Sequence, residues 1–114
     1  MVENQIAIKE DIEELFNLYK EIMPDVAEAY NPLPEEVYKE GVLPAKMKRL
    51  MALNGALVHG CRGCILHQVF QALELGATAE EILEACAVAI SLGGTMAAAE
   101  TTRVVKYLKD MGKI

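Results

Sequence analysis

Two cysteines separated by two residues have the clearest chemical potential in this sequence. The segment Cys61-Arg62-Gly63-Cys64 stands where a helix is expected to begin. Sulfurs at this spacing can join in a disulfide, and a cysteine in the first turn of a helix meets unpaired N–H groups that favour its thiolate. Because the thiolate reacts in disulfide exchange and in peroxide reduction, the pair predicts redox chemistry. Spacing alone does not decide which sulfur attacks.

Two other interpretations compete with redox chemistry. The pair can be half of a zinc site that His59 and His67 complete, although the spacing matches no common zinc module. Both cysteines can also be small buried residues of a core. Cysteine spacing favours the redox interpretation, and with it we expect neither a bound metal nor a cofactor.

Three residues around the pair differ in their expected roles. His67 follows Cys64 by three residues, so both lie on one helix face, and it is a candidate acid–base group. The alternative for His67 is a boundary histidine with one hydrogen bond. His59 precedes Gly60 at an expected helix end, where capping is the favoured role. Cys86 lies in an alanine-rich apolar stretch, which predicts a core position.

Helical periodicity and helix-end signals predict an all-α fold of about five to six helices. Helices are expected at about 9–23, 45–58, 61–75, 79–92 and 95–111, with 31–41 as a connector that holds one possible turn of helix. Thr78 and Glu81 form a Thr-x-x-Glu capping box. The Gly93-Gly94 pair breaks the chain, and a tight turn explains it better than an anion site. No period-2 strand pattern appears.

Size and composition point to one domain, residues 1–114, that assembles with copies of itself. The chain is 53% hydrophobic with a mean hydropathy of +0.19. A monomer of this size cannot hide so much apolar surface, because its surface-to-volume ratio is high. We therefore expect a homo-oligomer.

Charge and cysteine usage restrict the partners and the compartment. The net charge is −6, which disfavours binding to nucleic acid or to an anionic membrane, because both require a basic protein surface. The sequence contains no run of about 18 uninterrupted apolar residues, so no membrane span is expected. The first residues also lack the pattern of a signal peptide. Three cysteines are unlike the paired framework of a secreted domain, so a cytoplasmic protein is expected.

Several segments together resemble one family. These are residues 41–51, the run from Cys61 to Gln68, residues 72–82 and the Gly93-Gly94 break. Their order and spacing are similar to the carboxymuconolactone decarboxylase superfamily, which includes the AhpD-like alkylhydroperoxidases. The resemblance covers about residues 30–112, preceded by an N-terminal helix within 1–29. It implies a helical fold assembled into trimers or hexamers. It also implies that Cys64 attacks a peroxide and that Cys61 closes the disulfide.

The chain departs from the family pattern at two positions of its proton relay. Arg49 stands where the family has a glutamate, and Gln68 stands where it has a histidine four residues after the second cysteine. Arginine stays protonated and cannot act as a base, but its charge can hold a nearby sulfur as the thiolate. We therefore expect His67 to act as the acid–base group, with Arg49 supporting the thiolate.

Three functions follow from these residues. The intact cysteine pair favours a dithiol oxidoreductase that acts on peroxides or disulfides and draws electrons from an external thiol reductant. The departures at Arg49 and Gln68 favour an alternative function, in which the chain is a non-catalytic scaffold or small-ligand binder with the family fold. A lactone decarboxylase-like lyase would use the same pocket without thiol chemistry, and nothing in the residues positively supports it.

Overall fold

The computed structural model describes residues 3–114, which form six α-helices and contain no strand. The all-α prediction is confirmed. The helices are α1 Gln5–Ile22, α2 Pro24–Tyr30, α3 Pro32–Val37, α4 Ala45–His59, α5 Arg62–Glu74 and α6 Ala79–Asp110.

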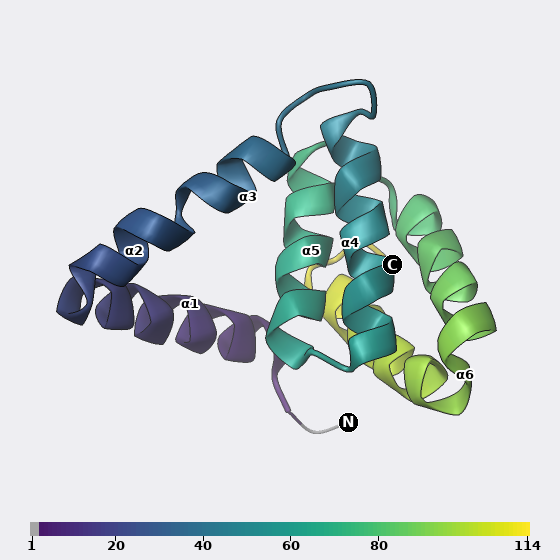
Figure 1. Cartoon of the computed structure of the whole chain (residues 1–114). Helices are drawn as coiled ribbons and strands as arrows, with labels where there is room; N and C mark the ends of the chain where they lie inside the picture. Colours follow the sequence, from purple (N-terminus) through teal and green to yellow (C-terminus); the bar gives the residue numbers. More distant parts are fainter. Residues whose placement is uncertain (1–2) are drawn as a thin grey trace.

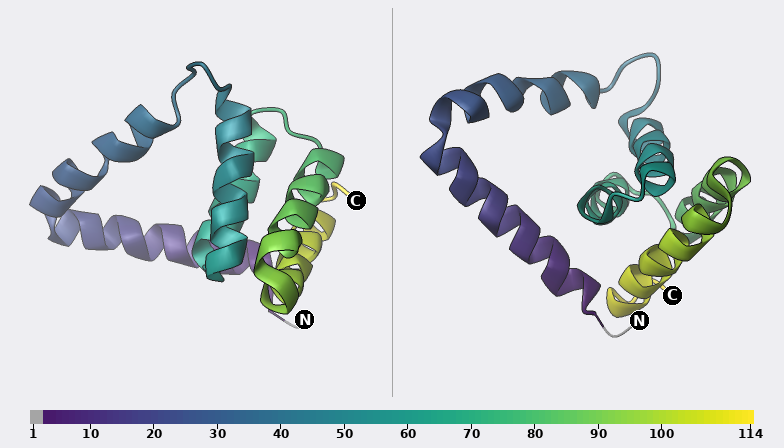
Figure 2. Two further views of the ribbon diagram at one scale, coloured as in Figure 1. Left: turned by 45° about the vertical axis from the view of Figure 1, so that its right-hand side comes forward. Right: turned by 60° about the horizontal axis from the view of Figure 1, so that its bottom comes forward.

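The helices divide into a packed core and a projecting arm (Figure 1). Helices α4, α5 and α6 pack against one another. The first three helices, here called the arm (residues 5–37), lead away from this core and return to it. Both views in Figure 2 show α1 along one side of the arm and α2 and α3 along the other, with the core helices between the two ends of the arm.

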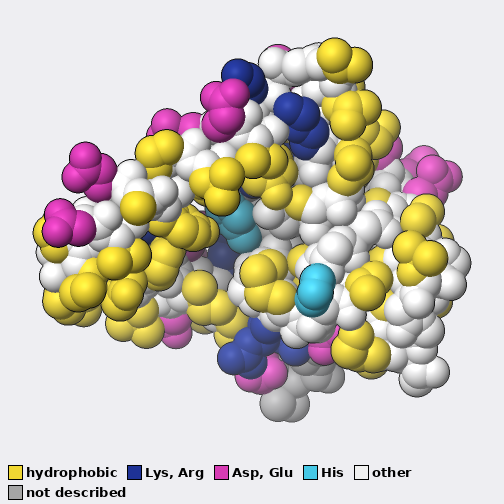
Figure 3. Space-filling model, in the orientation of Figure 1, with side chains coloured by type: hydrophobic (Ala, Val, Ile, Leu, Met, Phe, Trp, Pro, Cys, Tyr) yellow, Lys and Arg dark blue, Asp and Glu magenta, His cyan; other side chains and the backbone are white. Residues whose placement is uncertain are grey.

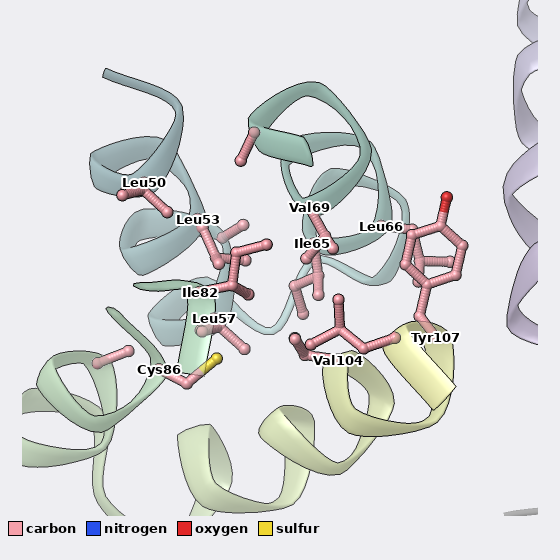
Figure 4. Packing of buried hydrophobic residues seen from close by; sticks show 14 of the residues in the cluster. Leu50, Leu53, Leu57, Ile65, Leu66, Val69, Ile82, Cys86, Val104 and Tyr107 are labelled. Atoms are coloured by element: carbon pink, nitrogen blue, oxygen red, sulfur yellow. The ribbon is translucent and has the colours of Figure 1, made fainter. Parts of the chain in front are cut away.

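The hydrophobic core lies between α4, α5 and the two halves of α6 (Figure 4). Its fully buried side chains include Leu53, Leu57, Ile65, Leu66, Val69, Ile82, Cys86, Val104, Tyr107 and Leu108. Burying one such aliphatic side chain stabilises the fold by about 1.5–3 kcal/mol. The cysteine pair opens α5, so this core fixes the helix that carries it.

Polar contacts attach both ends of the arm to the core. At the start of α1, buried Gln5 accepts a hydrogen bond of 2.8 Å from Arg103 of α6. At the end of α3, Lys48 of α4 donates to the backbone carbonyls of Val37 and Lys39, at 2.9 and 2.8 Å. Between these attachments α2 and α3 bury no residue.

The N-terminal third differs from the sequence expectation. Helix α1 begins at Gln5, four residues before the expected start, because the Asn4 side chain caps it by accepting from the Ala7 N–H at 3.1 Å. The expectation of one helix before residue 30 is wrong, since α2 follows α1 at once. Pro24 and Pro32 each open a helix, a position where the missing N–H costs nothing, so most of the expected connector is helical.

Helix α6 unites the two last helices expected from the sequence, with a break at Gly94. The expected capping box is present: the Thr78 hydroxyl accepts from the Glu81 N–H at 3.1 Å, and the Glu81 carboxylate accepts from the Thr78 N–H at 2.9 Å. By length and composition alone, α6 is apolar enough to cross a membrane. However, Gly94 (φ 64°, ψ −143°) bends it into two halves that pack on the core, each shorter than the ~20 residues that a span requires.

Replacing Gly94 with alanine should destabilise the fold, because this backbone conformation is nearly restricted to glycine. We expect a loss of about 1–3 kcal/mol in the free energy of unfolding, measured by urea denaturation. Gly55 is the matched control, since it lies inside α4 with open space where a Cβ would stand. Gly55→Ala should raise stability by up to about 1 kcal/mol. Equal effects at both glycines would contradict the argument.

Candidate functional site

The cysteine pair forms a disulfide at the start of α5. The Cα atoms of Cys61 and Cys64 are 5.2 Å apart. Gly60 ends α4 in the left-handed conformation (φ 71°), and this turn brings Cys61 to the N-cap position of α5. There the Cys61 sulfur accepts from the Cys64 N–H at 3.3 Å. Cys64 stands exposed in the first turn while Cys61 is half-buried, so an incoming molecule meets the second sulfur more readily.

A pocket of about 640 Å³, here called the Cys64 pocket, lies between the arm and α5. Figure 3 shows the hollow, with hydrophobic side chains around it and histidine and basic side chains in its depth. Its lining residues are Lys9, Ile12, Glu13, Phe16, Asn17, Lys20, Tyr30, Asn31, Pro34, Glu35, Gly63, Cys64, His67 and Gln68. The absence of a side chain at Gly63 lets α1 approach closely, since a Cβ there would stand 3.2 Å from the Ile12 side chain.

His67 lies in the Cys64 pocket, one turn after Cys64 on the same helix. Partial burial lowers the pKa of His67, the positive charges of Arg49 and Lys9 lower it further, and Glu13 opposes them. The imidazole is therefore neutral at pH 7. A neutral imidazole beside a thiol can accept its proton and later return it.

The two residues that depart from the family relay contact each other. Arg49 donates to the Gln68 side-chain oxygen at 3.2 Å, and its guanidinium carbon lies 3.6 Å from the centre of the Tyr38 ring. Gln68 in turn donates to the Tyr38 hydroxyl at 3.4 Å. Among the contacts of the described residues, none joins Arg49 to either cysteine sulfur. Its support of a Cys64 thiolate stays a prediction, and its visible role is to hold Gln68 and the end of α3.

This cluster predicts a measurable coupling between Arg49 and Gln68. Arg49→Met should cost about 1–2 kcal/mol of unfolding free energy, because the stacking on Tyr38 and the hydrogen bond are both lost. In a double-mutant cycle with Gln68→Met, we expect an interaction energy of about 1 kcal/mol from urea denaturation. Arg62→Met, which removes an exposed ion pair with Glu3, is the control and should change stability by less than about 1 kcal/mol. Additive effects of the two substitutions would contradict the coupling.

Two other residues from the sequence analysis lie away from the pocket. His59 is the exposed last residue of α4 and does not line the Cys64 pocket. Cys86 is buried in the core, as predicted, and its burial raises the pKa of the thiol to about 11. Such a thiol stays protonated and unreactive at neutral pH. Within residues 3–114, no group of three or more His, Cys, Asp or Glu side chains is arranged to hold a metal ion.

The contribution of α1 to the pocket was not expected from the sequence. Lys9 and Glu13 line the Cys64 pocket, and the Lys9 ammonium lies 2.5 Å from the Glu13 carboxylate. A signal was present: lysine and glutamate four residues apart can pair on one helix face. Nothing in the sequence indicated that this face meets α5, because that meeting depends on the arm's path around the core.

Sequence comparison places the chain among known proteins. The sequence model of the carboxymuconolactone decarboxylase family matches residues 24–107. The chain belongs to this family. It is also 30% identical over 97 residues to an uncharacterised protein of Cupriavidus necator, covering 85% of this chain and 86% of that protein.

Solved structures of family members share the fold. The apo form of lpg0406 from Legionella pneumophila matches with a TM-score of 0.87 and 26% identity, over 93% of this chain and 95% of that one. One structure of TM1620 from Thermotoga maritima matches with a TM-score of 0.79 and 28% identity, over 90% and 93%. A second TM1620 structure matches with a TM-score of 0.70 and 32% identity, over 75% and 88%. TM1620 is described there as a candidate for the antioxidative response.

Proposed function

We propose that this chain is a thiol-dependent oxidoreductase of the AhpD-like type, which reduces organic hydroperoxides or disulfides through Cys64 and Cys61. The observation that carries the proposal is the exposed position of Cys64 in a pocket beside His67, with Cys61 already within bonding reach. The description of TM1620 points in the same direction. We further propose a cytoplasmic setting, where thiol reductants are available.

The reaction balances without a cofactor. His67 takes the Cys64 proton, and the thiolate attacks the terminal peroxide oxygen. The O–O bond breaks as an S–O bond forms, and the alkoxide leaves as an alcohol with the proton from His67. The Cys61 thiol then attacks the Cys64 sulfenic acid, which releases water and forms the disulfide. An external dithiol reduces the disulfide by exchange and becomes oxidised itself.

The lining of the Cys64 pocket favours a substrate with an apolar body. Ile12, Phe16, Tyr30 and Pro34 supply much of the wall, and the Phe16 and Tyr30 rings meet edge to face with centroids 5.4 Å apart. An alkyl or aryl group would bury apolar surface against these side chains, while hydrogen peroxide would gain nothing from them. We therefore expect organic hydroperoxides to have a lower KM than hydrogen peroxide.

The test is a stoichiometric reaction of the fully reduced protein with cumene hydroperoxide. We expect one equivalent to be consumed per chain. Mass spectrometry should then find the chain lighter by two hydrogens, with Cys86 still alkylated after unfolding. Unconsumed hydroperoxide with both thiols intact would overturn the proposal and favour a non-catalytic binder. Stoichiometric zinc protecting both thiols would favour the metal site instead.

We also propose that the protein is a homo-oligomer, as a trimer or hexamer. The arm leaves large apolar side chains in solvent, among them Leu15, Ile22 and Leu33, each more than 60% exposed. An apolar surface of this kind usually meets a partner. Light scattering coupled to gel filtration should give a mass several times 12.5 kDa. Ile22→Asp should lower this mass, whereas Val42→Asp in the exposed loop before α4 should leave it unchanged. A wild-type monomer at micromolar concentration would contradict the proposal.

A further inference from the structure

The α1 wall of the Cys64 pocket carries an ion pair between a buried lysine and an exposed glutamate. Lys9 is only 8% exposed, and its ammonium lies 3.9 Å from the centre of the Phe70 ring. Its carboxylate partner is Glu13, one turn further along α1, at 2.5 Å. Burying an ammonium is costly unless an anion accompanies it, so the ion pair with Lys9 keeps the Glu13 carboxylate at the pocket wall.

Charged and titratable groups surround His67 from several helices. Lys20 of α1, Tyr30 of α2, Glu35 of α3 and Cys64 of α5 line the same pocket. The charges that act on the imidazole are those of Lys9 and Glu13 on α1 and Arg49 on α4. Lys9 and Arg49 disfavour a positive charge on it, and Glu13 favours it. A proton relay through His67 passes through the imidazolium, so its rate depends on an anion that makes this state accessible.

We propose that Glu13 is a positioning residue of the Cys64 proton relay. Its carboxylate stabilises the imidazolium that His67 becomes after it takes the Cys64 proton, and Lys9 fixes that carboxylate in place. The acidic member of the relay would then stand on α1, while the position expected for it on α4 holds Arg49. The inference rests on the proposed function, since only a reaction at Cys64 gives the relay a use.

The first test measures the titration of His67 directly, in the oxidised protein and without substrate. Imidazole NMR signals would be followed against pH, with His59 as the exposed internal reference. We expect Glu13→Gln to lower the His67 pKa, because the favourable anion is lost. Glu14→Gln is the matched control: it removes the same charge from the next residue, which does not line the Cys64 pocket.

Each outcome decides the inference. Identical His67 titrations in Glu13→Gln and Glu14→Gln would overturn it. If Glu13→Gln fails to fold, Glu13→Ala, compared with Glu14→Ala, provides the same test.

The second test is the pH dependence of hydroperoxide reduction. In Glu13→Gln the acid limb of the rate should move to lower pH, and the plateau rate should fall about threefold to tenfold, because His67 becomes a weaker base. Glu14→Gln should follow the wild type. A wild type that reduces no hydroperoxide would refute the proposed function, whereas a normal wild type with an unshifted Glu13→Gln profile would refute only the role of Glu13.

Discussion

Cys64→Ser should abolish hydroperoxide reduction, with a loss of at least about a thousandfold, because the substitution removes the attacking atom itself. Cys64 is the exposed member of the pair, and it lines the pocket that also contains His67. A serine hydroxyl keeps the size and the helix position but is not appreciably ionised near neutral pH. The measurement is the steady-state rate of cumene hydroperoxide loss in the presence of a dithiol, corrected for the dithiol alone.

Cys61→Ser should fail in a different way. Cys61 is half-buried at the N-cap of α5 and does not line the Cys64 pocket, which suits a residue that attacks the oxidised Cys64 from behind. Without reductant, this variant should still consume one equivalent of hydroperoxide but retain a sulfenic acid that dimedone labels. Cys86→Ser should behave like the wild type in both assays. Equal loss of the first equivalent in both pair variants would contradict the assignment of Cys64 as the attacking residue.

The core part of the fold was predictable because its signals are local. Gly60 and the Thr78–Glu81 box end and begin helices by hydrogen bonds to nearby backbone, and both appear at the expected residues. The cysteine pair was predictable for the same reason, since its spacing alone brings the sulfurs within reach. Cys86 followed from its apolar neighbours.

The helices of the arm were less predictable because a proline is compatible with two different positions relative to a helix. A proline stops a helix that precedes it, yet it also suits the first position of the next one. Pro24 and Pro32 act in the second way, and the chain continues as helix where a connector was expected. Two short helices with no buried residue also leave little apolar periodicity toward a core from which to recognise them.

The Cys64 pocket could not be predicted from local sequence patterns, because segments far apart in the chain form it. Lys9 and Glu13 line the same pocket as His67 because α1 passes close to the start of α5. The contact between Arg49 and Gln68 joins α4 to α5 in the same way. In the sequence, Arg49 and Gln68 were recognised as two separate departures from the family pattern. Their pairing makes them one joint change, in which a guanidinium–amide contact occupies the place expected for a carboxylate and an imidazole.

His67→Ala should slow hydroperoxide reduction about a hundredfold, because the thiol then lacks a base within the pocket and the alkoxide lacks a proton donor. Gln68→Ala should slow it much less, since an amide neither accepts nor donates a proton at these pH values. The direction of the His67 shift also fixes the pH dependence. Burial and neighbouring cations lower its pKa below 6.5, so the base form is available at neutral pH and is lost as the pH falls through that lowered value.

Protonation of His67 should therefore leave the wild-type rate unchanged around neutral pH. The rate should fall on acidification only below about pH 6.5. In His67→Ala this acid limb should disappear, because the group that titrates there is gone, and the remaining rate should follow ionisation of the Cys64 thiol alone. His59→Ala is the control, since it removes the exposed histidine outside the pocket. An acid limb that survives in His67→Ala but vanishes in another variant would move the acid–base role away from His67.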